Sequence, residues 1–362
     1  MASEVSHILW FQDLRPEARS LVGSKNASLG EMMREGLRVP SGFALTTLAY
    51  DAFIENAGLR PRIHTALGGL DPEDTGAVEA ISRGLRAEIE RATLPRSVAE
   101  ELRLSYAVLA EEACTPTPPV AVRSSGTAED MAGASFAGQQ DTYLWVQGVE
   151  SLASHTLRCW SSLFTPQAIS YRARMGYPPE AVSMSVGVQR MVDARVAGVM
   201  FTVNPLNGDP SKIVIEASWG LGLSVVGGEV TPDDYWVDKV TLGVIRRNVC
   251  RKATKYVRDP AGGGVSVVAV PEPAQAVPCL TDGEVIELAR LGKALEVVCG
   301  SARDIEWAID EVLPSPDNVL LLQCRPETIW SRRRAEPLVA PKATGIDYVL
   351  GAMLGPPPRK AE

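Results

Sequence analysis

Apolar side chains recur along this chain with helical spacing in three stretches. The longest runs from Thr47 to about Glu112, and glycine- or proline-containing breaks interrupt it at Gly58, Gly68–Asp74 and Pro95. A shorter helix is expected over Lys25–Glu35, entered from a Gly-Ser turn, and another over about Asp282–Cys299.

Short apolar runs between these stretches predict strands. They lie at Arg38–Ala44, Val120–Val122, Val182–Val192, Gly198–Val203, Ile213–Ala217, Tyr235–Asp238, Asp304–Ile309 and Val319–Cys324. Helices and strands therefore alternate, which indicates an α+β (α/β) chain. We expect an N-terminal lobe over residues 1–181, a second lobe over 182–330, and a basic, proline-rich tail over 331–362 that forms no packed domain.

Composition and charge narrow the classes of function. A chain of 362 residues fits two lobes, and its net charge of −8 argues against a general nucleic-acid binder, so a few placed cations must hold any anionic ligand. The sequence shows neither a secretory signal nor an apolar stretch of the roughly 20 residues that cross a membrane. Six scattered cysteines without a CxxC pair are typical of reduced thiols. We expect a cytoplasmic protein.

Two segments in the first half have the chemistry of phosphate binding. Lys25 follows a glycine-containing turn at a helix start, where free backbone N–H groups favour an anion. Arg123 ends an apolar strand and runs into a Ser/Gly loop, where its guanidinium can present a fork to phosphate. The small-residue loop Ser135–Thr142 can fold over a polyphosphate. An ordinary helix cap with a solvated lysine and a surface loop explain the same residues.

The last two expected strands gather three polar groups. If they pair as an antiparallel hairpin around Pro314-Ser315-Pro316, alternation brings Glu306 near Gln323 and Arg325, with Leu322 and Cys324 on the other face. A carboxylate, an amide oxygen and a guanidinium suit Mg²⁺ with a triphosphate. A solvent-facing strand with a salt bridge is the alternative.

Two further residues have weaker signals. Glu216 ends a strand before the turn Gly220-Leu221-Gly222 and either stands beside the site or belongs to a structural turn. Gln189 lies on an expected strand, from which it can reach an adenine edge.

Seven motifs together resemble one known family. They are Gly-Ser-Lys-Asn-Ala-Ser-Leu-Gly-Glu, Val-Pro-Ser-Gly-Phe, Ala-Val-Arg-Ser-Ser-Gly-Thr-Ala-Glu-Asp, Ser-Phe-Ala-Gly-Gln-Gln-Asp-Thr, Gly-Val-Met-Phe-Thr-Val-Asn-Pro, Asp-Ile-Glu-Trp-Ala and Leu-Gln-Cys-Arg-Pro-Glu-Thr. In order and wording they resemble the nucleotide-binding part of phosphoenolpyruvate synthase, pyruvate phosphate dikinase and rifampicin phosphotransferase. The resemblance covers about residues 10–330.

The resemblance implies a two-lobed ATP-grasp fold that binds ATP and Mg²⁺. It also implies residue roles, carried over by motif position: phosphate-binding cations Lys25, Arg123 and Arg325, polyphosphate-loop residues Gly138 and Thr142, the adenine contact Gln189, and the metal-binding pair Glu306 and Gln323. Relatives usually have an acidic residue after the Gly-Leu-Gly turn, where this chain has Leu223 and Ser224.

The resemblance also implies a reaction that this chain cannot complete with its own histidines. In the family, a histidine in a Thr-Ser-His type motif takes phosphoryl from ATP, which yields AMP and Pi. This chain has His7, His64 and His155, none in that context. We therefore expect a split enzyme, in which a second subunit brings the histidine and the acceptor pocket, as in phenylphosphate synthase, with phenol as the final acceptor. A split phosphoenolpyruvate synthase, an antibiotic phosphotransferase subunit and a non-catalytic ATP sensor are the alternatives.

Overall fold

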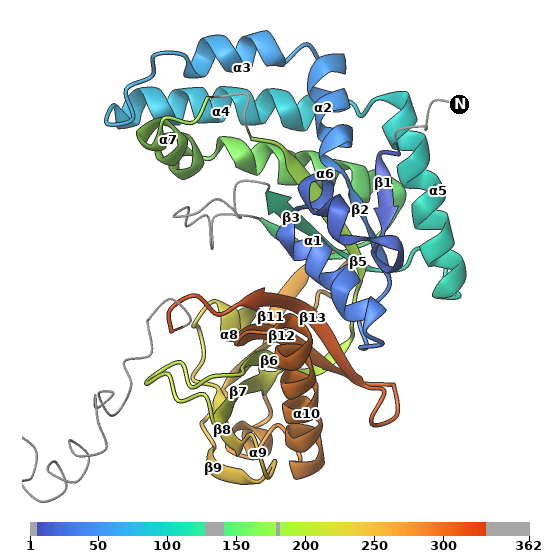
Figure 1. Ribbon diagram of the computed structural model, residues 1–362. Helices are drawn as coiled ribbons and strands as arrows, with labels where there is room; N and C mark the ends of the chain where they lie inside the picture. The colour runs from blue at the N-terminus through green and yellow to red at the C-terminus, as the bar shows by residue number, and fades with distance from the viewer. Residues whose placement is uncertain (1–5, 127–140, 179–181, 331–362) are drawn as a thin grey trace, which may run out of the picture. The chain divides into compact units, whose positions relative to one another are not determined.

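A computed structural model describes residues 6–126, 141–178 and 182–330 of the chain (Figure 1). The described residues up to Glu327 belong to one compact unit. Gly138 and the expected tail over 331–362 lie outside the described residues. The chain combines helices with strands, as the alternating pattern predicts, and the strands within each sheet pair antiparallel, which the pattern did not predict.

Five strands form the first sheet, and every neighbouring pair is antiparallel. In spatial order they are β1 (Ile8–Trp10), β2 (Gly42–Leu45), β5 (Met184–Arg190), β3 (Val120–Gly126) and β4 (Thr142–Val146). The strand β5, expected to open the second lobe at residue 182, pairs within this first sheet. The chain enters the second sheet only after Arg190, at β6 (Ala194–Phe201).

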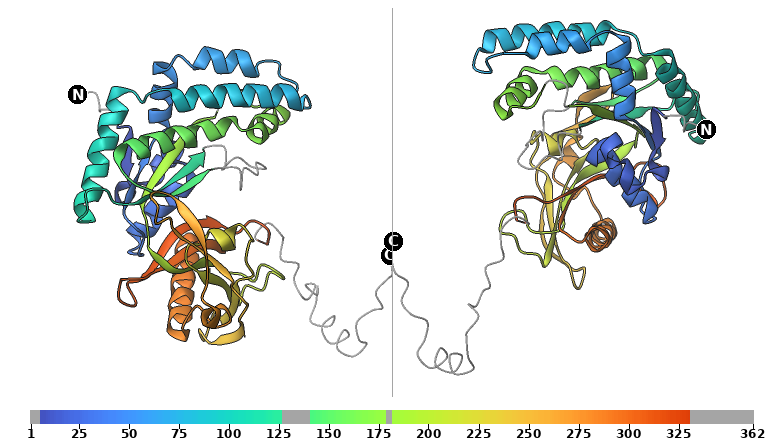
Figure 2. Two further views of the ribbon diagram at one scale, coloured as in Figure 1. Left: turned by 180° about the vertical axis from the view of Figure 1, so that it is seen from behind. Right: turned by 45° about the horizontal axis from the view of Figure 1, so that its top comes forward.

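In the described part of the sequence, seven α-helices lie between or directly after the first four strands in the chain. They are α1 (Arg19–Arg34), α2 (Thr47–Asn56), α3 (Arg60–Leu67), α4 (Thr75–Arg91), α5 (Arg96–Glu112), α6 (Val149–Ser161) and α7 (Pro166–Met175), with 3₁₀ turns at Phe11–Asp13, Pro16–Ala18 and Ser162–Phe164. Breaks in the expected helical stretch fall where predicted, because local signals fix them: Asp74 caps α4 by accepting from the N–H of Ala77, and Pro95 precedes α5. Helix α6 packs on the sheet, α4 packs on α6, and α3 and α7 pack against α4 (Figure 2).

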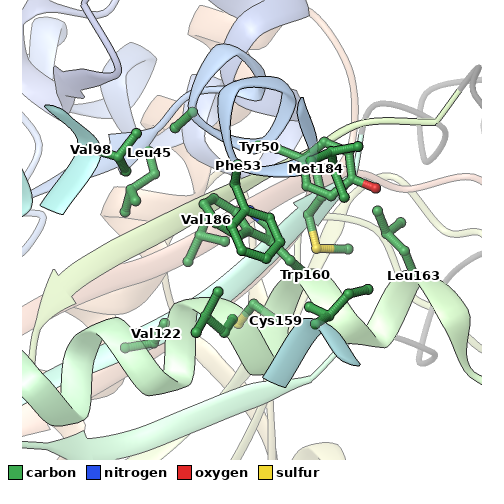
Figure 3. Packing of buried hydrophobic residues seen from close by; sticks show 14 of the residues in the cluster. Leu45, Tyr50, Phe53, Val98, Val122, Cys159, Trp160, Leu163, Met184 and Val186 are labelled. Atoms are coloured by element: carbon green, nitrogen blue, oxygen red, sulfur yellow. The ribbon is translucent and has the colours of Figure 1, made fainter. Parts of the chain in front are cut away.

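The first sheet has two different faces. On β5, Met184, Val186 and Val188 point into a core that α6 covers, where Trp160 stacks on Phe53 with 5.0 Å between ring centroids (Figure 3). Because side chains alternate along a strand, the intervening positions of β3 and β5 face the opposite side, toward α1. That second face carries the polar residues of the candidate site.

Six strands form the second sheet. In spatial order they are β13 (Val319–Pro326), β12 (Arg303–Asp310), β6, β7 (Lys212–Trp219), β8 (Asp233–Asp238) and β9 (Val244–Asn248). The other elements in this part of the chain are α8 (Leu223–Val226), α9 (Glu272–Gln275), α10 (Asp282–Cys299) and the hairpin of β10 (Thr254–Arg258) with β11 (Val265–Ala269). A capping box between Thr281 and Glu284 begins α10, and Gly300 ends it in the left-handed conformation.

The expected hairpin of β12 and β13 forms, with one irregularity that alternation did not predict. Glu306 pairs with Gln323, but the next residue, Trp307, pairs with Leu321, so Leu322 is an extra residue in a bulge. As a result Leu322 and Cys324 do not share a face: Leu322 packs beside Ala308, whereas Cys324 joins the core with Trp307. The expectation that Leu322 and Cys324 share a face was therefore wrong, because the bulge turns Leu322 to the other face.

Candidate functional site

A break in helix α1 positions Lys25. Gly23 has φ 71° and ψ 168°, which are not helical, so the helix restarts just before Lys25. A Cβ at this glycine would lie 2.3 Å from Ser125 Oγ, so the close approach to β3 also requires glycine. The ammonium of Lys25 donates to the carbonyl of Ser124 at 3.3 Å. Lys25 therefore lies against β3. Its hydrogen-bond partner there, Ser124, directly follows Arg123 in the sequence.

Arg123 joins the two sheets. It lies on the α1 face of β3, because its neighbour Val122 points into the other core. Its Nη1 donates to the carbonyl of Leu322 on β13 at 3.0 Å and lies 3.9 Å from Glu306 Oε2. The side chains of Arg123 and Glu306 are 16% and 20% exposed, and among the described residues the Nε of Arg123 has no hydrogen-bond partner. This guanidinium is thus fixed in direction between the carbonyl of Leu322 and the carboxylate of Glu306.

The hairpin of β12 and β13 presents the other predicted residues. Glu306 is directly opposite Gln323, and Asp304 is directly opposite Arg325. Arg325 Nε donates to Asp304 Oδ2 at 2.9 Å, although the arginine side chain remains 47% exposed. Burial raises the pKa of Asp304, while Arg325 opposes that shift. Asp304 was not among the predicted site residues, although it lies two residues before Glu306 and therefore on the same strand face.

Thr142 and Gln189 have different surroundings. Thr142 is opposite Arg123 on the neighbouring strand β4 and is exposed. Gln189 is opposite Ala121 on the α1 face, but only 2% of it is exposed, and no residue in the described part of the chain accepts a hydrogen bond from its amide nitrogen. The predicted adenine contact stays a prediction.

Two more carboxylates extend from the hairpin across the second sheet. Glu306 pairs with Val199, Val199 with Glu216, and Glu216 with Asp234, so the three acids lie along one row. Burial raises the pKa of Glu216, and the charges of Asp234 and Asp304 raise it further. Glu216 therefore lies in the same row as Glu306, with strand β6 between them.

The oxygen donors fit a magnesium ion in part. Glu306 supplies a carboxylate and Gln323 an amide oxygen, the ligand chemistry that Mg²⁺ prefers. Within the described residues no three His, Cys, Asp or Glu side chains form a complete metal site. Protein Mg²⁺ sites in nucleotide enzymes commonly use one or two side chains and take their remaining oxygens from phosphate and water. The pair Glu306–Gln323 has this composition.

The histidines lie elsewhere in the first part of the chain. His7 Nδ1 is 2.6 Å from Glu101 Oε1, an ion pair when the ring is protonated, and His155 Nδ1 is 2.7 Å from the carbonyl of Ser151. His155 and Thr142 also line a hollow of about 500 Å³ beside β4, and neither Arg123 nor Glu306 is among its lining residues. Size alone does not make this hollow the nucleotide site, because the paired cations and carboxylates are not among its lining residues. No helix in the described part of the chain is both long and apolar enough to span a bilayer.

Comparisons with known proteins agree with the resemblance seen in the motifs. The family model for the pyruvate phosphate dikinase AMP/ATP-binding domain matches residues 19–344. A probable phosphoenolpyruvate synthase from Staphylothermus marinus is 43% identical over 361 residues, which cover 94% of this chain and 43% of the relative. The corresponding protein from Methanocaldococcus jannaschii is 42% identical, over 91% of this chain and 27% of the relative.

A bacterial relative gives the same result. The phosphoenolpyruvate synthase of Pseudomonas aeruginosa is 41% identical over 87% of this chain and 41% of its own length. The chain thus spans less than half the length of these three relatives. Since the family model covers most of the sequence and includes Lys25, Arg123, Glu306 and Arg325, this chain belongs to the family of the pyruvate phosphate dikinase AMP/ATP-binding domain.

Proposed function

We propose that this chain binds Mg-ATP between its two sheets in an ATP-grasp arrangement, as the ATP-binding part of a dikinase-type phosphotransferase. One observation carries the proposal: Arg123 of the first sheet donates to Leu322 at 3.0 Å and lies 3.9 Å from Glu306 of the second. Cations and oxygen ligands from distant parts of the chain therefore converge. Membership of an AMP/ATP-binding family supports the nucleotide assignment.

The side chains suit phosphoryl transfer, which depends mainly on positioning and on neutralising charge. Lys25 and Arg123 would bind the polyphosphate from the first sheet, and Arg325 from the second. Arg325 is already oriented by Asp304, so a phosphate can share or replace this carboxylate as its partner. Mg²⁺, held by Glu306 and Gln323, would neutralise phosphate charge. Thr142, opposite Arg123, would donate its hydroxyl to the same polyphosphate.

The phosphoryl acceptor in this proposal is a histidine outside residues 1–362, on a partner subunit or a further domain. A neutral imidazole is already a nucleophile, so the ATP site needs no strong base. For the final acceptor we propose pyruvate, because the similar proteins are phosphoenolpyruvate synthases. Phenol, expected from the sequence, has no support among these relatives and is tested beside pyruvate.

Binding and chemistry are tested separately. Calorimetry should show Mg-ATP binding by the wild-type chain, and Arg123→Ala should weaken it by roughly 10–100-fold, since hydrogen bonds to charged groups contribute about 1.5–3 kcal/mol each. Arg103→Ala, which removes an exposed arginine that pairs with Glu100 on α5, is the matched control and should bind normally. Absence of nucleotide binding by the folded wild type would refute the proposal.

The second measurement is release of AMP and Pi, with and without the histidine-bearing domain of a relative. AMP formation that requires this domain supports the phosphotransferase, and arms with pyruvate, phenol or water identify the acceptor. ATP binding with no AMP in any arm would instead favour an ATP sensor. Rapid AMP formation by the chain alone would contradict the need for an external histidine.

A further inference from the structure

The outer edge of strand β13 is held by residues from the first part of the chain. β13 is the terminal strand of its sheet, so one row of its backbone groups has no neighbouring strand. Arg38 bonds two of these groups: its carbonyl accepts from the N–H of Leu321 at 2.8 Å, and its Nε donates to Val319 at 3.1 Å. Arg123 holds the carbonyl of Leu322.

Ser28 bonds a further carbonyl of β13, that of Cys324, two residues after Leu322. Its hydroxyl donates to the carbonyl of Cys324 at 2.7 Å, across 296 positions of sequence. Serine within a helix commonly bonds a carbonyl of its own preceding turn. In α1 this hydroxyl instead makes a tertiary contact with the strand that carries Gln323 and Arg325.

The contact links three predicted ligand-binding residues. Ser28 is three residues after Lys25, so both lie on one face of α1. Gln323 lies between the two carbonyls that Arg123 and Ser28 hold, and Arg325 directly follows the second. Movement of the Cys324 carbonyl would therefore shift both side chains relative to Lys25.

Helix α1 is a rigid anchor for this contact. The buried amide of Asn26 donates to the carbonyl of Val22 at 3.0 Å and to Ser185 Oγ on β5 at 3.1 Å. A Cβ at Gly187 would lie 2.2 Å from Asn26 Oδ1, so helix and strand touch here. Because α1 is fixed to the first sheet, its serine can fix the edge of the second.

We propose that Ser28 is a positioning residue, whose hydroxyl sets Gln323 and Arg325 at the spacing from Lys25 that a magnesium-bound polyphosphate requires. The inference rests on the proposed function, because it assigns a role within the same ATP site. A structural bond would lower only stability. A positioning bond changes the Mg²⁺ dependence of nucleotide binding as well.

The experiment compares Ser28→Ala with Ser82→Ala. Ser82 is the matched control, because it is also a helix serine whose hydroxyl donates to a distant carbonyl, that of Phe164, at 2.6 Å. We expect both variants to melt below the wild type. Only Ser28→Ala should raise the Mg²⁺ concentration for half-maximal ATP binding, by about 10-fold, the lower range for residues that orient metal ligands.

Two further variants keep the test decisive. Ser28→Thr retains the hydroxyl and should restore the Mg²⁺ dependence, and Ser28→Cys replaces Ser28→Ala if the alanine variant fails to fold. If the magnesium requirement of the hydroxyl-free variant equals that of Ser82→Ala, Ser28 is purely structural and the inference is wrong. A wild-type chain that binds no Mg-ATP would overturn the proposed function instead, so the two failures are distinguishable.

Discussion

At the scale of single residues, three carboxylates crowd one region of the second sheet. Burial raises the pKa of Glu216, Asp234 and Asp304 above the ordinary value of a carboxyl group. Arg325 pairs with Asp304, and the ring N–H of Trp236 bonds to Asp234. Desolvation dominates at Glu216, and neighbouring negative charges add to it. Ionisation of Glu216 is therefore less favourable in the folded chain than in the unfolded chain.

This imbalance predicts a pH-dependent effect of Glu216→Gln. As pH rises, Glu216 ionises first in the unfolded chain, so its presence lowers folded stability above about pH 4.3 and not below. Without nucleotide or Mg²⁺, Glu216→Gln should melt about 1–3 °C above wild type at pH 7.5. Thermal melts should show this difference disappearing near pH 4.

The exposed Glu111, on α5, provides the control. Glu111→Gln should have the same melting temperature as the wild type at every pH measured. If the melting temperature of Glu216→Gln exceeded that of the wild type by more at acid pH than at pH 7.5, ionised Glu216 would not be the destabilising form.

Residue types and motif order predicted which side chains lie near one another, but not their hydrogen-bond partners, and the roles of these side chains in binding ATP and Mg²⁺ stay predictions. Lys25, Arg123, Glu306 and Gln323 come together as the motifs implied, since each follows or lies on an element with a clear local signal. The carbonyl of Leu322 as partner of Arg123 was not predictable, because it depends on the register between strands distant in sequence.

At the scale of elements, the ends of helices were predictable from local signals, whereas the pairing and contacts of distant segments were not. Helix α10 spans Asp282–Cys299 as expected, because a capping box and a terminal glycine mark its ends. The bulge at Leu322 was missed, since an extra residue leaves no mark in an apolar run. The turn before Lys25 was predicted, but its contact with β3 was not.

That contact leads to a prediction for Gly23→Ala, with Gly36→Ala as its control. Both glycines have nearly equal positive φ, 71° and 72°, but a Cβ would meet Ser125 only at Gly23 and nothing within 4 Å at Gly36. Gly36→Ala should lower the free energy of unfolding by about 1–2 kcal/mol, the cost of a left-handed backbone. Gly23→Ala should lower it by about 3 kcal/mol or more, since a steric contact adds to that cost.

Denaturant unfolding measures the two stabilities, and calorimetry measures Mg-ATP affinity at a temperature where both variants are folded. We expect only Gly23→Ala to weaken nucleotide binding, because its clash displaces the turn that carries Lys25. Equal losses of stability in the two variants would show that the contact with Ser125 is not tight.

At the scale of the whole compact unit, one core cluster draws on both sheets. Val22 and Leu29 of α1 pack in the same cluster as Met200, Ile305 and Trp307 of the second sheet. Ala44 of β2 joins this cluster, while its neighbours Phe43 and Leu45 belong to the other core. Unfolding either sheet alone would expose apolar surface shared with the other, so the two should unfold together.

Scanning calorimetry should therefore show one transition for residues 1–327, and Mg-ATP should move it as a whole. A ligand at 100 times its dissociation constant stabilises the folded state by about 2.7 kcal/mol, which corresponds to about 4 °C for a chain of this size. ATP with excess EDTA should produce a smaller shift, since Glu306 and Gln323 would then lack the cation that links them to phosphate. Two transitions, of which Mg-ATP moves one, would mean that the shared cluster does not couple the sheets and that the nucleotide contacts a single sheet.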